Sequence, residues 1–184
     1  MTKNKKIQTF LLRFAISYAL LFLLYSFYLN KTQQQTTVFA CSPVTNTVAK
    51  HTEQMAYLLG YDVTTNQSSK ELSLAITING KPVLRLIEGC NGVSVIILFI
   101  AFIIAFKGSL KQTIIYAVLG SLLIYILNIF RIVALTVAML KYPKYQEFLH
   151  QIIFPLFIYG VVFLLWVVWV NKFVLKQKVV CQKS

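Results

Sequence analysis

The chain has 184 residues, a length that fits one domain, and 58% of them are apolar, with a mean hydropathy of +0.70. This composition excludes an ordinary soluble fold, because several apolar stretches approach or exceed the ~20 residues that a membrane-spanning helix needs. The net charge of +13 does not indicate nucleic-acid binding, since the basic residues gather at the ends of the apolar stretches. We therefore expect an all-α polytopic membrane protein, with residues 1–184 as a single membrane domain in contact with lipid.

Four apolar runs are predicted to span the membrane, at about residues 7–29, 91–106, 113–134 and 152–170. Short lysine-rich elements precede the first run, join the second to the third, and follow the fourth. All five acidic residues lie in the other two connections. Because basic residues favour the cytoplasmic side, both termini are predicted to be cytoplasmic and segment 30–89 to lie outside.

The first run begins with lysines, as a signal peptide does, but its apolar part is longer than the ~7–15 residues of a signal peptide's apolar core. We therefore expect an uncleaved anchor. Residues 38–41 faintly resemble a lipoprotein cleavage box, but a polar stretch separates them from the apolar run, so we do not expect lipidation of Cys41. A disulfide between Cys41 and Cys90 is conceivable, although no spacing favours it. Cys181 is predicted to be cytoplasmic.

The outer segment is predicted to contain a small helix and a β-hairpin. Residues 45–59 place Val48, Met55, Leu58 and Leu59 on one helical face, which we expect to rest on the membrane surface or on the spans. Residues 61–70 are predicted to be a polar loop. Alternating apolar residues then indicate two strands joined at Asn79-Gly80, a strong hairpin signal, and Pro82 favours an edge position for the second strand. The hairpin must pack on another element, because an isolated one is marginal in water.

Three chemically active residues are predicted to lie at the same depth. With a rise of about 1.5 Å per residue, Cys90 lies roughly 25 Å above Lys107, Arg131 roughly 30 Å above Lys111, and His150 roughly 33 Å above Lys172. The hydrocarbon layer is about 30 Å thick, so all three side chains reach the outer interface, each from a different span.

Each of these residues also has a structural interpretation. A cysteine is often a small buried residue, but Cys90 is predicted to begin a helix, where the macrodipole favours a thiolate. Arg131 could anchor the interface. However, Ser121, Tyr125, Asn128 and Arg131 share one helical face, which indicates that the face turns inward. His150 is assigned only by its shared depth, and His51 is interpreted as a surface residue without a role.

The segments Cys90-Asn91-Gly92 and Asn128-x-x-Arg131, followed by His150, resemble the exosortase/archaeosortase family of membrane cysteine transpeptidases, in the short form of the exosortase F class. The resemblance covers roughly 85–155, and family members commonly have more spans. It implies a catalytic triad of Cys90, Arg131 and His150, supported by Asn91, Gly92 and Asn128. It also implies a bacterial cytoplasmic membrane protein whose active site faces outward and whose substrates are exported proteins with a C-terminal sorting signal. Either four helices enclose the substrate, or a small membrane partner or a second copy of the chain completes the site.

The residues alone also support acyl transfer. A thiolate would attack a peptide carbonyl, a histidine would transfer the proton, and an arginine, which stays protonated, would stabilise negative charge. Transpeptidation and hydrolysis both remain open, and no cofactor or metal is expected because no ligand spacing is present. The alternative is a non-catalytic membrane assembly or partner protein of an export or surface-anchoring system, in which Arg131 pairs with a partner's carboxylate and Cys90 merely packs.

Overall fold

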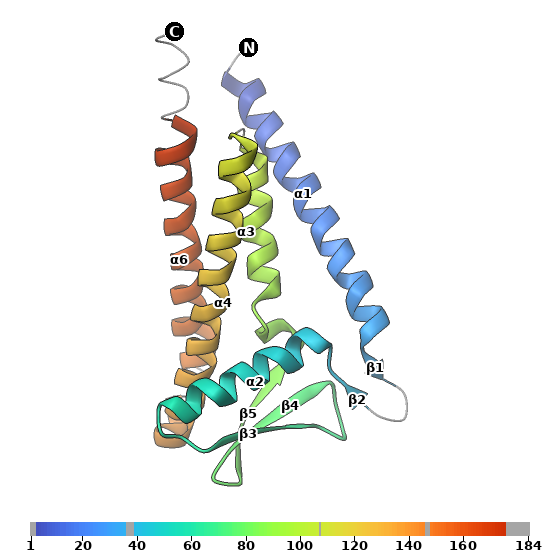
Figure 1. The fold of residues 1–184 in the computed structure, drawn as a ribbon, viewed down its shortest axis with the longest axis vertical. Coiled ribbons are helices and arrows are strands. Elements are labelled where there is room, and N and C mark those ends of the chain that lie inside the picture. Colours follow the sequence, from blue (N-terminus) through green and yellow to red (C-terminus); the bar gives the residue numbers. More distant parts are fainter. Residues whose placement is uncertain (1–2, 36–38, 107, 146–147, 176–184) are drawn as a thin grey trace.

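The computed structural model describes residues 3–35, 39–106, 108–145 and 148–175. Its long elements are four helices: α1 (Lys3–Thr32), α3 (Val93–Ala105), α4 (Leu110–Lys141) and α6 (Phe154–Trp169). α6 is extended at both ends by π-helical turns, η3 (Leu149–Ile153) and η4 (Val170–Leu175). Figure 1 shows these helices side by side, with the start of α1 and the end of α6 at one end of the bundle and a small α/β layer at the other.

Three helices are long and apolar enough to cross a membrane, namely Ile7–Thr32, Leu110–Lys141 and Leu149–Phe173. The chain is therefore a mostly helical membrane protein, as expected. The predicted span at 91–106 forms only the 13-residue helix α3, which covers about 20 Å. α3 is shorter than a complete span requires, so the structure supports three of the four predicted spans by length.

Close aromatic packing joins the helices. The ring of Phe99 in α3 lies directly on Gly120 of α4, where an added β-carbon would lie 2.3 Å from the ring. Phe99 belongs to a buried cluster with Ile103, Ile124, Val162 and Trp169. α1 joins through Phe10, whose ring lies 5.6 Å from that of Phe102. The best apolar window of α1 contains no buried residue, so this helix lies at the edge of the bundle.

The α/β layer begins with α2 (Pro43–Leu58). The N-cap of α2 is Ser42, whose side chain accepts from the Thr45 N–H at 3.4 Å. The helix begins two residues earlier than predicted because Ser42-Pro43 forms the cap and first turn. Its buried residues are Thr45, Val48, Ala49, Thr52 and Ala56. Val48 of the predicted apolar face is buried, whereas Leu58 and Leu59 are 78% and 54% exposed. They lie at the end of the helix, beyond the buried stripe.

The α/β layer also contains a three-stranded antiparallel sheet in the order β3 (Val63–Gln67), β4 (Ser73–Ile78) and β5 (Lys81–Ile87). The predicted hairpin is its β4–β5 pair. Asn79 and Gly80 have φ values of 51° and 74°, as a tight hairpin turn requires. β5 lies at an edge, as Pro82 indicated. The predicted loop at 61–70 is wrong in part, because β3 pairs with β4 there. In a separate two-stranded sheet, β1 (Gln34–Gln35) pairs with β2 (Phe39–Ala40).

One apolar core fixes this layer to the bundle. Leu74, Ile76, Ile78 and Leu86 from the sheet are buried in the same cluster as Val48 and Ala56 of α2 and Ile132 and Val133 of α4. The sheet and α2 therefore pack on the C-terminal half of α4, as expected for a hairpin that cannot stand alone. This contact sets the position of the chain segment that follows β5.

Candidate active site

The residue of greatest chemical interest, Cys90, lies in a short turn between the sheet and the bundle. β5 continues into the 3₁₀ turn η1 (Glu88–Cys90), and α3 begins only at Val93, with Gly92 as its N-cap at φ 83°. The prediction that Cys90 begins the helix is therefore wrong by three residues. The Asn91 side chain, not the thiol, occupies the helix end, because its Oδ1 accepts from the Val93 N–H at 3.0 Å.

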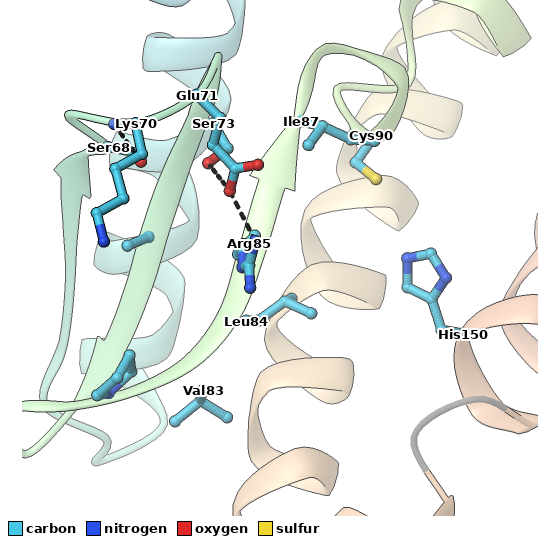
Figure 2. Close-up of a pocket in the computed structure, with 12 residues that line it drawn as sticks. Ser68, Lys70, Glu71, Ser73, Val83, Leu84, Arg85, Ile87, Cys90 and His150 are labelled. Carbon is cyan, nitrogen blue, oxygen red and sulfur yellow. Dashed lines mark hydrogen bonds and ion pairs between the residues drawn. The ribbon is translucent and has the colours of Figure 1, made fainter. Parts of the chain in front are cut away.

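Cys90 and His150 face one another across a cavity of about 830 Å³ (Figure 2). Both side chains are half-buried. His150 lies in the π-helical turn η3, which leads directly into α6, two residues before the predicted start of the last span at 152. The remaining walls come from the sheet and the β3–β4 connection: Ser68, Lys70, Glu71, Ser73, Ala75, Pro82, Val83, Leu84, Arg85 and Ile87.

Arg131 is connected to Cys90 through one intermediate residue. Its Nη1 donates to Asn128 Oδ1 at 3.4 Å, and Asn128 Nδ2 donates to the carbonyl oxygen of Cys90 at 3.0 Å. Arg131 is not among the described residues that line the cavity. Its Nε is buried and has no hydrogen-bond partner in the described part of the chain. The guanidinium is therefore linked to the Cys90 turn from outside the cavity lining, and its Nε–H is still able to donate a hydrogen bond.

The polar face of α4 contacts the α/β layer as well as Cys90. Tyr125 forms a 2.6 Å hydrogen bond between its hydroxyl and His51 Nδ1 of α2. His51, interpreted from sequence as an unassigned surface residue, is exposed but linked to this face. Asn128 is 2% exposed, and Ser121 Oγ is buried without a hydrogen-bond partner among the described residues. The inward orientation predicted for this face is therefore confirmed.

Sequence reasoning missed Glu88, two residues before Cys90. Its carboxylate accepts hydrogen bonds from the Ser42 N–H at 2.6 Å, the Ser42 hydroxyl at 2.9 Å and the Thr45 hydroxyl. Asn91 Nδ2 also donates to it, at 3.3 Å. No local pattern signals these contacts, because the α2 residues lie more than 40 positions earlier in the chain. Among the described residues, the ion pair of the site is Arg85 Nη1 with Glu71 Oε1 at 2.9 Å, and this hydrogen bond lowers the pKa of Glu71.

The remaining thiols and acidic groups set limits on other chemistry. Cys41 and Cys90 are both free, so the conceivable disulfide between them is not formed. Cys41 is 3% exposed, and burial raises the pKa of its thiol. Cys181 lies outside the described residues. Within the described ranges, no group of three histidine, cysteine or acidic side chains could hold a metal ion.

The fold defines an integral membrane protein whose helical bundle carries a small α/β layer at one end, with a cysteine and a histidine facing each other at the junction. A family model described as transmembrane exosortase (Exosortase_EpsH) matches residues 8–170. Because the match covers most of the chain, the protein belongs to the transmembrane exosortase family. Searches of curated proteins and of solved structures found no match. Family membership indicates a membrane transpeptidase or sorting function.

Proposed function

We propose that this exosortase is a membrane-embedded cysteine peptidase that processes the C-terminal sorting signal of exported proteins. Cys90 is the nucleophile, His150 is the general acid and base, and Arg131 is the electrostatic stabiliser, with Asn91, Gly92 and Asn128 in support. The family match supports the class of chemistry. The observation that carries the residue assignment is the shared cavity of Cys90 and His150.

The proposed reaction has two acyl-transfer steps. His150 takes the thiol proton, and the sulfur of Cys90 forms a bond to the scissile carbonyl carbon. As the tetrahedral intermediate collapses, the peptide C–N bond breaks and His150 gives its proton to the departing amine. An amine or a water then attacks the thioester, His150 takes a proton from the attacking group, and the thiolate leaves. The positive charge of Arg131 lowers the energy of the thiolate and of the oxyanion.

The edge of the sheet is suited to hold the substrate peptide. Among the described residues, β5 pairs only with β4, and its residues Val83, Leu84, Arg85 and Ile87 line the cavity on the way to Cys90. An extended peptide added alongside β5 would gain main-chain hydrogen bonds and run toward the thiol. Its scissile bond would reach Cys90 without further folding of the substrate.

The proposed orientation places both termini in the cytoplasm of a bacterium and the cavity outside the cytoplasmic membrane. The lysine-rich ends of the apolar runs support it. In this orientation α3 acts as the fourth span, and the small number of spans supports the exosortase F class. Large apolar side chains exposed on α1 and α6, such as Leu23 (65%) and Leu156 (69%), would contact lipid, a small membrane partner or a second copy of the chain.

The test is conversion of a tagged exported precursor, followed by immunoblot with the enzyme level measured in the same membranes. Cys90→Ala should abolish conversion, and Cys90→Ser should be nearly inactive because a neutral hydroxyl is a weaker nucleophile than a thiolate. His150→Ala should lose most activity, and adding it to Cys90→Ala should cause no further loss. Cys41→Ala is the matched control, since it removes a buried free thiol away from the cavity. Wild-type conversion by Cys90→Ala would refute the enzyme and favour the assembly-protein alternative.

A further inference from the structure

We propose that Glu88 is a positioning residue that holds the Cys90 turn against the N-terminal end of α2. The inference rests on the proposed function, because it takes Cys90 as the reacting residue. It assigns a role to a carboxylate that touches neither the cavity nor any of the residues proposed for the chemistry except Asn91.

The contacts of Glu88 are those of a cap supplied by a distant part of the chain. Ser42 is the N-cap of α2 and Thr45 is its third residue, and both are 0% exposed. The Glu88 carboxylate accepts from the Ser42 main chain and from both hydroxyl groups. It therefore sits at the positive end of the α2 macrodipole, where a negative charge is stabilised. Since α2 is fixed to α4 by the apolar core, this bond fixes Glu88 as well.

A second anchor holds the other side of Cys90. Asn91 is 1% exposed, and its Nδ2 donates to the Tyr25 hydroxyl of α1 at 2.8 Å and to Thr45 Oγ1 at 3.0 Å. The carbonyl of Cys90 itself accepts from Asn128 of α4. The turn is thus tied to α1, α2 and α4, while the Cys90 side chain stays free to point into the cavity toward His150 (Figure 2).

The residue type matters at position 88. An ionised carboxylate only accepts hydrogen bonds and can serve several donors at once, whereas a glutamine amide has one accepting oxygen and two N–H donors. Glu88→Gln would therefore keep the side-chain size, but its amide N–H groups would face the N–H and hydroxyl donors of Ser42 and Thr45. We expect the turn to shift, and a displacement of about 1 Å at a reacting atom can reduce the rate about 100-fold.

The first measurement is turnover of a peptide substrate by the full-length enzyme in lipid vesicles. Glu88→Gln should lower kcat about 10- to 100-fold and change KM little, because the β5 wall of the cavity is untouched. Thr45→Val retains Glu88 but removes the hydroxyl that donates to Glu88 and accepts from Asn91, and it should lower kcat by a smaller factor. The double variant should be no worse than Glu88→Gln alone, since both changes disrupt the same contact.

The second measurement separates positioning from general loss of stability. The alkylation rate of Cys90 is followed by mass spectrometry across pH in the wild type, His150→Ala and Glu88→Gln. If Glu88 holds the thiol opposite the imidazole, the Glu88→Gln profile should move toward that of His150→Ala. The matched control is Glu53→Gln. Glu53 accepts from the Thr65 hydroxyl at 2.6 Å and ties α2 to β3, away from Cys90. Glu53→Gln should lower the unfolding temperature but leave the pH profile of Cys90 alkylation as it is in the wild type.

The outcomes separate the two proposals. If Cys90→Ala is inactive but Glu88→Gln matches the wild type in kcat and alkylation profile, the positioning role is refuted and the proposed function stands. If Cys90→Ala is active, the proposed function fails instead. Should Glu88→Gln not accumulate in membranes, Thr45→Val decides. A shift of its Cys90 profile toward that of His150→Ala supports the role, and a wild-type profile refutes it.

Discussion

The Asn128 side chain lies directly against Gly92, where an added β-carbon would be 3.1 Å from the amide carbon and nitrogen. The same amide donates to the Cys90 carbonyl. Gly92 also has φ 83°, a left-handed conformation that suits glycine. The absence of a side chain at this position thus lets α4 reach the backbone of the candidate nucleophile.

Gly92→Ala should reduce both stability and turnover. The left-handed backbone alone costs alanine about 1–2 kcal/mol, and the new methyl group would push Asn128 away from Cys90. Gly60→Ala is the matched control, because Gly60 also has φ 83° but has no heavy atom within 4 Å of an added β-carbon. Thermal unfolding and precursor conversion are measured for both. Equal losses of activity in the two variants would show that the Asn128 contact is irrelevant to turnover.

Arg131→Lys should lower turnover by about 10- to 100-fold despite keeping the charge. The guanidinium can bond Asn128 with one nitrogen while its other nitrogens remain available, and a lysine ammonium lacks this planar arrangement. Arg13→Lys, at an exposed position in α1, should retain wild-type turnover. The rates are compared at equal enzyme levels in membranes. Retained activity in Arg131→Lys would limit the role of Arg131 to that of a charged group.

Replacing Asn79 and Gly80 with valines should spoil the β4–β5 turn and lower processing, while the protein remains in the membrane. Both positions have positive φ, and each substitution costs about 1–2 kcal/mol. The control is Asn66→Val in β3, because a β-branched residue suits an exposed strand position outside the cavity. Precursor conversion is the measurement. Unchanged conversion in the turn variant would exclude the hairpin from substrate binding.

Cys41 should be alkylated much more slowly than Cys90 at neutral pH. Burial raises the pKa of the Cys41 thiol, so the folded state favours its protonated form. The contribution of this thiol to folding stability is fully present below its pKa in the unfolded chain. It is lost as the pH rises through the pKa of the thiol in the folded protein. The unfolding temperature should therefore fall in alkaline solution, and by less in Cys41→Ala. Mass spectrometry of the two cysteine peptides checks the labelling, and rapid labelling of Cys41 at neutral pH would contradict its burial.

The sequence predicted those parts of the fold that local patterns encode. Apolar runs located the helices, and Asn79-Gly80 located the hairpin turn. β3 was missed because its central residues, Thr64 to Asn66, are polar and lack the alternation of a half-buried strand. The start of α2 was missed although Ser42 as the N-cap and Pro43 in the first turn mark it locally.

The candidate site shows the same division between local and distant information. Counting residues from the basic ends of the spans predicted that Cys90 and His150 would share one end of the bundle, and both line one cavity. Arg131 was grouped with them by depth, but depth carries no information on direction around the helix axis. The structure instead places Asn128 between Arg131 and the Cys90 backbone. This chain of hydrogen bonds depends on side-chain rotamers and on the close approach of Asn128 to Gly92. A single sequence does not specify either of them.

The shortness of α3 has a consequence for the surrounding lipid. Its 13 residues cover about 20 Å, whereas the hydrocarbon layer is about 30 Å thick. Such a hydrophobic mismatch is relieved when the adjacent leaflets thin and the headgroups move toward the short helix. The Cys90 turn at its end would then lie below the level of the surrounding membrane surface. Under the proposed function, a peptide bond attacked there would lie close to the membrane, so its depth in the membrane would select the scissile bond as much as the residues flanking it.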